Sequence, residues 1–245
     1  MQVDAFAIRL RRRAKMEAID LGVRLCQQAA RSVFPCYLMV AVPIVLLAFA
    51  SFELADWVPT LVLWCAKPWL DRSVLFVLSR AAFGQATAPR DLWRNQRLVW
   101  WTQFIRTWTF RRLSPWRSLT QPAYQLEGLA RRKLRKRVLQ IRSGYANTGM
   151  LLTSAFSFAE LALSTTLLSL LLWFIPGEQQ FDLMELFTGD EEGRSALFAS
   201  TASYALVVLF LEPFYVAAGF ALYLNRRVEL EAWDVEQELR RAFAR

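Results

Sequence analysis

Residues 195–225 read SALFASTASYALVVLFLEPFYVAAGFALYLN, a long apolar stretch whose single charged residue is Glu212. A second stretch, residues 149–175, reads GMLLTSAFSFAELALSTTLLSLLLWFI, and its single charged residue is Glu160. An α-helix rises about 1.5 Å per residue, so about 20 apolar residues cross the hydrocarbon core of a bilayer. Each stretch is therefore long enough to cross a membrane as one helix.

The two glutamates occupy equivalent positions in these stretches. Glu160 lies as far after Asn147 as Glu212 lies before Asn225. If the two helices are antiparallel neighbours, both carboxyl groups lie at about the same depth. A charged carboxyl group in hydrocarbon costs free energy, so we expect both glutamates to face the protein interior and to have partners there.

Composition supports a membrane protein and excludes several kinds of chemistry. The chain has 245 residues, of which 55% are hydrophobic and 21% charged, as expected for apolar spans that alternate with charged loops. Histidine is absent, which excludes histidine-based catalytic triads and metal sites. The three cysteines have no paired spacing, and no phosphate-binding glycine loop or serine nucleophile motif is present. We therefore expect a protein that is not an enzyme and holds no cofactor and no metal.

Two further apolar stretches precede the pair with glutamates. Residues 33–52 contain no charge and predict a first span, because transmembrane helices tolerate prolines such as Pro35 and Pro43. A cleaved signal peptide is not expected, because a long charged segment precedes this stretch and no small-residue cleavage site follows it. Residues 54–83 are ambiguous, because the charged segment KPWLDR at 67–72 interrupts their apolar sequence.

The distribution of charge decides the orientation. Residues 1–32 and 84–146 are rich in lysine and arginine, whereas residues 176–193 contain acidic residues and no basic ones. The positive-inside rule places both basic regions in the cytoplasm and the acidic loop, residues 176–194, outside. The chain must then cross back between residues 54 and 83. The alternative, a re-entrant hairpin at 54–83, would put residues 84–146 outside.

The predicted fold is an all-α, polytopic membrane helical bundle that forms a single domain over residues 1–245. Both termini are expected in the cytoplasm, with amphipathic helices on that side at residues 1–32, 84–146 and 226–245. The four transmembrane helices are expected at residues 33–52, 54–83, 149–175 and 195–225.

A continuous crossing of residues 54–83 would bring five charged residues to a similar depth, two of them basic and three acidic. The members of this predicted cluster are Lys67, Asp71, Arg72, Glu160 and Glu212. Thr153, Ser157 and Ser164 extend the face of Glu160 into a polar stripe, and Tyr215 and Gly219 share the face of Glu212. Such a cluster either locks the packing of the helices or forms a site for a proton, an ion or a lipid headgroup. Both interpretations stay open.

The basic region begins with a pattern typical of a membrane surface. Apolar residues recur at helical spacing within residues 92–113, and arginines fill much of the remainder. Tryptophan favours the headgroup zone and arginine favours anionic lipid, so we expect an amphipathic helix on the cytoplasmic surface. The alternative is a helix packed on its own bundle. The residues expected at the lipid interface are Trp93, Trp100, Trp101, Trp108, Arg94, Arg97, Arg106, Arg111 and Arg112.

Two more cytoplasmic segments follow from charge and periodicity. A second basic helix is expected at about residues 123–145, and its basic run at 131–137 is explained as a topology signal near acidic lipid rather than as a nucleic-acid site. Residues 226–245 continue the fourth span with an apolar stripe, which suits docking on the protein's own helices or on a partner. The residues expected to dock a partner are Trp233, Asp234 and Glu236.

Five segments carry a resemblance to a known family: IDLGVRL at 19–25, KPWLDR at 67–72, LSRAAFG at 78–84, EPFYVAAGFALYLNRR at 212–227 and EAWDVE at 231–236. Together they resemble a proteobacterial family of polytopic inner-membrane proteins that is distantly similar to the membrane domain of glycerophosphodiester phosphodiesterases. The genes of that family tend to neighbour those for an AAA+ ATPase chaperone, a von Willebrand factor A-like protein and transglutaminase-like membrane proteins.

The resemblance implies a non-enzymatic protein of the bacterial inner membrane, a scaffold or subunit of an envelope complex linked to an AAA+ ATPase. Its expected partners are anionic lipids of the inner leaflet and other proteins of the complex. No phosphodiesterase activity is expected, because no part of the chain resembles the catalytic domain of those enzymes. The alternative is a small transporter, channel or lipid-handling protein that uses Glu160 and Glu212.

Overall fold

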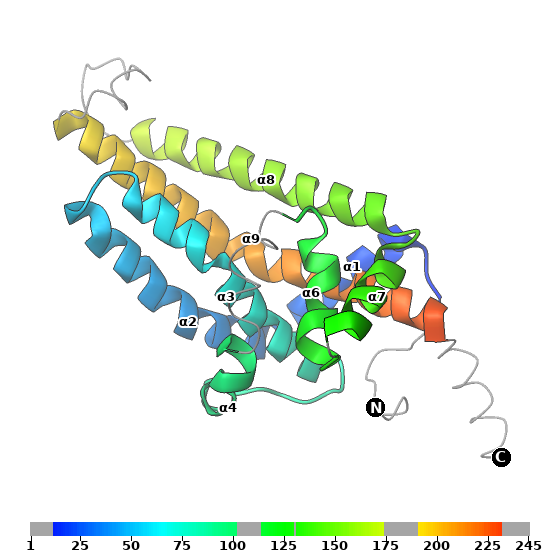
Figure 1. Ribbon diagram of the computed structural model, residues 1–245. Coiled ribbons are helices and arrows are strands. Elements are labelled where there is room, and N and C mark those ends of the chain that lie inside the picture. Colours follow the sequence, from blue (N-terminus) through cyan, green and yellow to red (C-terminus); the bar gives the residue numbers. More distant parts are fainter. Residues whose placement is uncertain (1–11, 102–113, 130, 174–190, 232–245) are drawn as a thin grey trace.

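The computed structural model describes residues 12–101, 114–129, 131–173 and 191–231. All regular secondary structure in these ranges is helical (Figure 1), which confirms the expected all-α class. The elements are α1 (Lys15–Gln28), α2 (Ala30–Ala50), a 3-10 turn (Ser51–Glu53), α3 (Val58–Ala81), α4 (Pro89–Arg94), a π-helical turn (Arg97–Trp101), α6 (Arg117–Leu126), α7 (Arg131–Arg142), α8 (Ala146–Trp173) and α9 (Glu191–Glu231).

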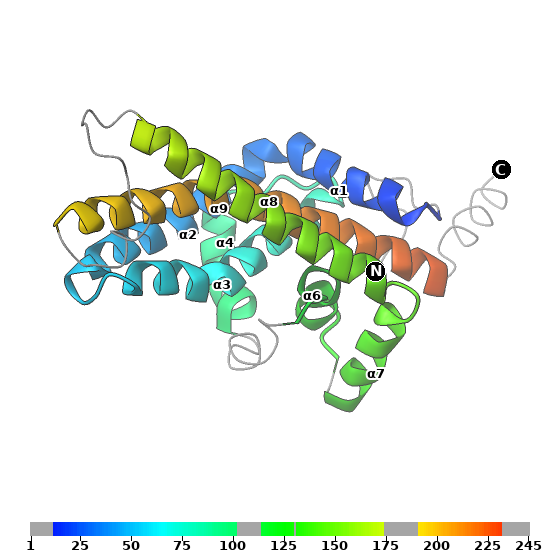
Figure 2. The same cartoon turned by 90° about the horizontal axis from the view of Figure 1, so that it is seen from above.

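The long helix α9 is the centre of the fold. Helices α1, α3, α6 and α8 all pack against it, and α8 runs antiparallel to it along much of its length (Figures 1 and 2). In the most apolar part of α9, 72% of the residues are buried, against 6% in the corresponding part of α8. Helix α8 therefore packs on one side only and exposes an apolar face on the other.

Two glycines allow α9 to pack closely against its neighbours, one at the crossing with α1 and one at the crossing with α6. A Cβ atom at Gly22 of α1 would lie 2.3 Å from the carbonyl oxygen of Ala217. A Cβ atom at Gly219 of α9 would lie 2.2 Å from the Cβ atom of Ser118. Small residues at such crossings let helix backbones pack tightly. Gly219 therefore positions α6 directly against α9, beside the predicted charge cluster.

Three helices of the described ranges are long and apolar enough to cross a membrane. They are Ala30–Glu53, Ala146–Leu171 and Ala196–Glu231, with mean hydropathies of 2.4, 1.4 and 2.0. They correspond to the first, third and fourth expected spans. Large apolar side chains on them point outward, among them Leu46, Phe158 and Phe210, as suits a lipid-facing surface.

Helix α3 covers the fourth candidate, residues 54–83, but its charged residues make it less apolar than the other three. It is nevertheless one helix over 24 residues, with Pro68 in its interior. The charged segment at 67–72 does not break the helix. Most of the residues from Ala66 to Leu78 are buried within the protein, so these charges lie inside the bundle.

The basic region differs from expectation in two respects. The single amphipathic helix predicted for 92–113 is already interrupted, because α4 ends at Arg94 and a separate π-helical turn begins at Arg97. The side-chain amide of Asn95 donates a hydrogen bond to the carbonyl of Asp91 at 2.8 Å, and such local bonds compete with a regular helix. Residues 102–113 of the predicted helix lie outside the described residues.

The second basic helix, predicted at about 123–145, is in fact two helices. Helix α6 begins at Arg117 and includes Pro122 in its interior. Gly128 then adopts a φ of 58°, a left-handed conformation that favours glycine, and this turn separates α6 from α7. Helix α6 buries Ser118, Leu119 and Thr120, so it belongs to the core of the bundle and not to its basic surface.

Candidate functional site

Lys67 of α3 brings the two isolated glutamates together. Its Nζ atom forms an ion pair with Oε1 of Glu160 on α8 and lies 3.3 Å from Oε2 of Glu212 on α9. The ring of Tyr204 lies 5.5 Å from the same nitrogen. Glu160 and Glu212 therefore share one depth in neighbouring antiparallel helices, the geometry expected from their positions in the sequence.

The second base of the cluster is Arg117, which was not expected from the sequence. Its Nη2 atom lies 3.0 Å from Oε1 of Glu212, and its Nε atom lies 3.1 Å from Oδ2 of Asp71. The guanidinium group also lies 5.2 Å from the ring centre of Tyr215. Arg117 thus connects α6 to both α3 and α9. No signal in the sequence singled it out, because residues 98–105 of the basic region are uncharged just as residues 118–126 are.

The expected base Arg72 lies on a different face of α3 from Asp71. Lys67 and Asp71 are four residues apart and share one face of α3, whereas Arg72 is displaced from Asp71 by about 100° around the helix. Arg72 lines a smaller cavity together with Thr120 and Tyr124 of α6, and Arg117 lines both this cavity and the larger one. Arg117 is thus the second base in contact with the acids, and the membership of Arg72 in the cluster stays a prediction.

The cluster is buried and contains three acids against two bases. Asp71, Lys67 and Glu212 are 0%, 7% and 4% exposed. Lys67 and Arg117 provide two positive charges against three negative ones, so the cluster has a net charge of −1 when all groups are ionised. Removing charges from water is costly and only close partners offset that cost. The five side chains therefore depend on one another, and loss of one leaves a buried charge without its partner.

A cavity of about 380 Å³ adjoins the cluster. The predicted polar stripe of α8 lines one wall, and the hydroxyl of Thr153 hydrogen-bonds to the hydroxyl of Tyr215 at 3.1 Å. The aromatic rings that complete the wall belong to Trp64, Phe156, Tyr204 and Tyr215. This volume falls within the usual range for small-molecule pockets. Glu160 has the more accessible side chain of the two glutamates, 19% exposed against 5% for Glu212.

The residues expected at the lipid interface divide into two groups where the structure describes them. Trp93, Arg94, Arg97 and Trp101 are exposed. Trp100 instead packs inward, and its indole N–H donates a hydrogen bond to Oγ of Ser73 on α3 at 2.9 Å. This hydrogen bond holds the π-helical turn Arg97–Trp101 against α3. The remaining residues of the expected interface, Arg106, Trp108, Arg111 and Arg112, lie outside the described residues.

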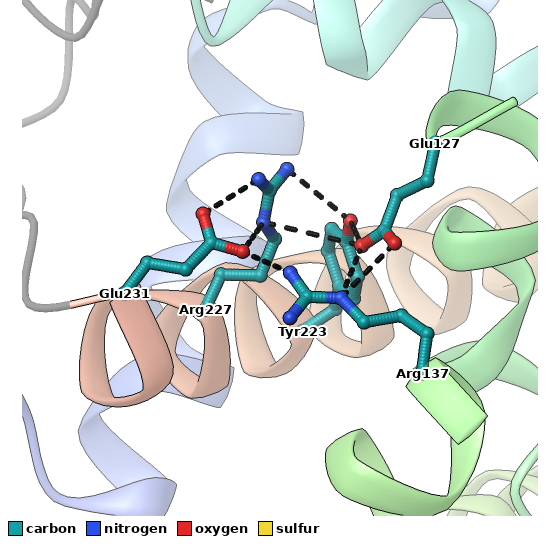
Figure 3. A network of polar contacts seen from close by, with 5 residues as sticks. All are labelled: Glu127, Arg137, Tyr223, Arg227 and Glu231. Carbon is teal, nitrogen blue, oxygen red and sulfur yellow. Dashed lines mark hydrogen bonds and ion pairs between the residues drawn. The ribbon is translucent and has the colours of Figure 1, made fainter. Parts of the chain in front are cut away.

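A second polar network ties the end of α9 to α6 and α7 (Figure 3). Arg137 of α7 forms ion pairs with Glu127, at 3.0 Å between Nε and Oε2, and with Glu231. Arg227 pairs with Glu231 at 2.7 Å, and the hydroxyl of Tyr223 donates to Glu127 at 2.7 Å. Burial alone would lower the pKa of Arg137, but the hydrogen bonds to Glu231 and Glu127 raise it. The start of the 226–245 segment thus contacts the protein's own helices, while Trp233, Asp234 and Glu236 lie outside the described residues.

A third network joins the start of the described chain to α9. The side-chain amide of Asn225 accepts a hydrogen bond from the backbone N–H of Arg13 and donates one to the carbonyl of the same residue, both at 3.0 Å. It also donates to the hydroxyl of Tyr145 at 2.9 Å, and that hydroxyl donates to Glu229 at 2.7 Å. Burial, together with the hydrogen bond to Glu229, raises the pKa of Tyr145.

Comparison of this chain with protein-family models, with curated proteins and with solved structures found no match. The class of protein is therefore inferred from the helices and the cavity of the chain itself. The described residues form an all-helical protein with three helices long and apolar enough to cross a membrane. A charged and aromatic cavity lies between two of these helices and α3. No group of cysteine, aspartate and glutamate side chains in the described ranges is arranged to hold a metal ion.

Proposed function

We propose that this chain is an integral protein of the bacterial inner membrane that crosses it four times, with α2, α3, α8 and α9, and keeps both termini in the cytoplasm. The pairing of Lys67 and Asp71 with residues of α6, α8 and α9 supports a transmembrane α3, because its charges then face protein and not lipid. The basic surface of α7 and the acidic sequence of residues 176–193 support the orientation.

Reporter fusions test this topology. Alkaline phosphatase, which is active only outside the cytoplasm, is fused after residue 86 in one chain and after residue 180 in another. Four spans predict activity of the second fusion alone. Activity of the fusion after residue 86 would instead support the re-entrant hairpin, because that arrangement puts residues 84–146 outside.

Within this topology we propose a non-enzymatic role, as a scaffold or subunit of an envelope complex linked to an AAA+ ATPase. The observation that carries this role is the internal pairing of the buried charges, since Lys67 and Arg117 between them contact all three acids of the cluster. Charges committed to one another hold helices together. The link to an ATPase is supported by the resemblance of the sequence segments named above. Anionic lipids of the inner leaflet suit the exposed Trp93, Trp101 and the basic face of α7.

Co-purification from native membranes in mild detergent tests the scaffold role. We expect an AAA+ ATPase to accompany the full chain and to be lost when residues 232–245 are deleted. This deletion keeps Glu231 and its ion pairs, so the described fold is preserved. The triple variant Trp233→Ala, Asp234→Ala and Glu236→Ala should have the same effect. Purification of the full chain alone, with full function in cells, would contradict this role.

The cavity of about 380 Å³ favours a second candidate function, a small transporter, channel or lipid-handling protein. Its two glutamates and its aromatic walls suit a cation or a headgroup that carries an ammonium group. In reconstituted liposomes, Glu160→Gln should then abolish cation flux or lipid transfer. Glu53→Gln, which changes an exposed acid in the turn after α2, is the matched control. Equal rates in the wild type and in Glu160→Gln would exclude this second function.

A further inference from the structure

A second cavity, of about 80 Å³, lies between α3, α6 and α7. Three arginines line it, one from each helix: Arg72, Arg117 and Arg142. None of the described residues that line it is acidic. The cavity is thus distinct in its chemistry from the larger one, which is lined by Glu160 and Glu212 as well as by Lys67 and Arg117.

Two hydrogen-bond donors at this cavity are buried without a partner among the described residues. They are Nε of Arg142 and Nε2 of Gln121, and Oε1 of Gln125 is a buried acceptor that also lacks a hydrogen-bond partner there. Burial without a hydrogen bond costs free energy, so native structures leave few such groups unsatisfied. No acid of the described chain forms an ion pair with Arg142. A ligand that accepts hydrogen bonds and carries negative charge would satisfy both donors.

The cavity is built from side chains that are held in place. The guanidinium group of Arg142 stacks on the ring of Trp116, with 3.5 Å between its Cζ atom and the ring centre. Trp116 is fixed in turn, because its indole N–H donates to the carbonyl of Ala146 at 2.9 Å. Gln125 donates to the carbonyl of Arg72 at 2.9 Å, which ties α6 to α3 beside the cavity. A stacked guanidinium group keeps its N–H groups available in the plane of the group.

We infer that this cavity binds a phosphate group. Guanidinium groups match phosphate oxygens in charge and in the spacing of their donors, and such pairs form strong bidentate hydrogen bonds. A volume of about 80 Å³ accommodates a few water molecules or one small anion rather than a large organic molecule. Arg117 is neutralised by Asp71 and Glu212, so the positive charge left for the ligand comes mainly from the side of Arg142.

The phosphate can belong to an anionic lipid of the adjoining leaflet or to a free, soluble phosphate. The binding test uses the full chain, purified in a phosphate-free maltoside detergent and stripped of lipid. One arm titrates inorganic phosphate and follows binding by calorimetry. The other arm adds phosphatidylglycerol and counts bound lipid by native mass spectrometry. Saturable binding in either arm that depends on Arg142 supports the site, and the arm that responds identifies the source.

Arg142→Gln should weaken binding roughly tenfold or more, the usual effect of losing a hydrogen bond to a charged group. Arg135→Gln is the matched control, because it removes the same charge from an exposed position of α7. Gln121→Glu adds a carboxylate to the cavity and should weaken binding at least as strongly. If Arg142→Gln fails to fold, Gln121→Glu serves as the test variant in its place. Equal binding of both probes by the wild type, Gln121→Glu and Arg135→Gln would overturn the inference, as would the absence of binding by the wild type.

Discussion

Arg117 and Glu212 lie 3.0 Å apart, between Nη2 and Oε1, although they are 95 positions apart in the sequence. Through this ion pair α6, a helix of the basic region, is held in the centre of the bundle. Asp71 holds the other side of the same guanidinium group at 3.1 Å. Arg117 therefore joins three helices, and the two carboxylates that it contacts have only Lys67 as a further base in the described cluster.

Loss of Arg117 should destabilise the protein strongly. Arg117→Ala leaves Asp71 and Glu212 as buried acids without their shared partner, and breaking one side of a buried ion pair costs roughly 3–5 kcal/mol. We expect a clear fall in the melting temperature in detergent, with part of the loss restored when Asp71→Asn and Glu212→Gln are added. Arg135→Ala, which replaces an exposed arginine of α7, is the control. If Arg117→Ala and Arg135→Ala melt at the same temperature, the cluster does not stabilise the fold.

The contact of Lys67 with Glu160 and Glu212 could be predicted from the sequence for a physical reason. Charges are costly in apolar surroundings, so isolated acids in apolar helices must find a base at their own depth. Arg117 could not be found in that way, because hydropathy does not show that a helix outside the apolar stretches folds back into the core. The depth of Arg72 in the sequence does not tell which face of α3 it occupies, and Arg72 lies about 100° around that helix from Asp71. The break at Asn95 coincides with a side-chain hydrogen bond to Asp91, which no periodicity reveals.

The crossing of α6 and α9 should tolerate no side chain at Gly219. A Cβ atom there would lie 2.2 Å from the Cβ atom of Ser118 and 2.6 Å from its carbonyl carbon, so the backbone of α6 must shift. We expect Gly219→Ala to cost about 1–3 kcal/mol, as overpacking of a core does. Denaturant titration in detergent measures this change. Gly149→Ala is the control, because its nearest contact is a flexible Leu119 side chain at 3.2 Å.

Asn225 should decide how firmly residues 12–14 are attached to α9. Its side chain makes two hydrogen bonds with the backbone of Arg13, and Asn225→Ala removes both. We expect a loss of about 1–3 kcal/mol and faster tryptic cleavage after Arg12 and Arg13 in the native protein. Asn95→Ala is a suitable control, because Asn95 is exposed and lies in the basic region. Equal cleavage rates in the two variants would show that Asn225 does not hold this segment.

Cys26 should give the protein a measurable sensitivity to alkaline pH. This thiol of α1 is 0% exposed, and burial raises its pKa to about 12. A group with a raised pKa in the folded state stabilises the protein below its unfolded pKa, and this contribution is lost as pH rises from about 9 toward 12. The fall in melting temperature over that range should therefore be smaller in Cys26→Ala than in the wild type.

Native Cys26 should also resist alkylation by a maleimide at neutral pH and react after unfolding in detergent, because the thiolate is the reactive form. Rapid labelling of Cys26 in the native protein would contradict its burial beneath α9.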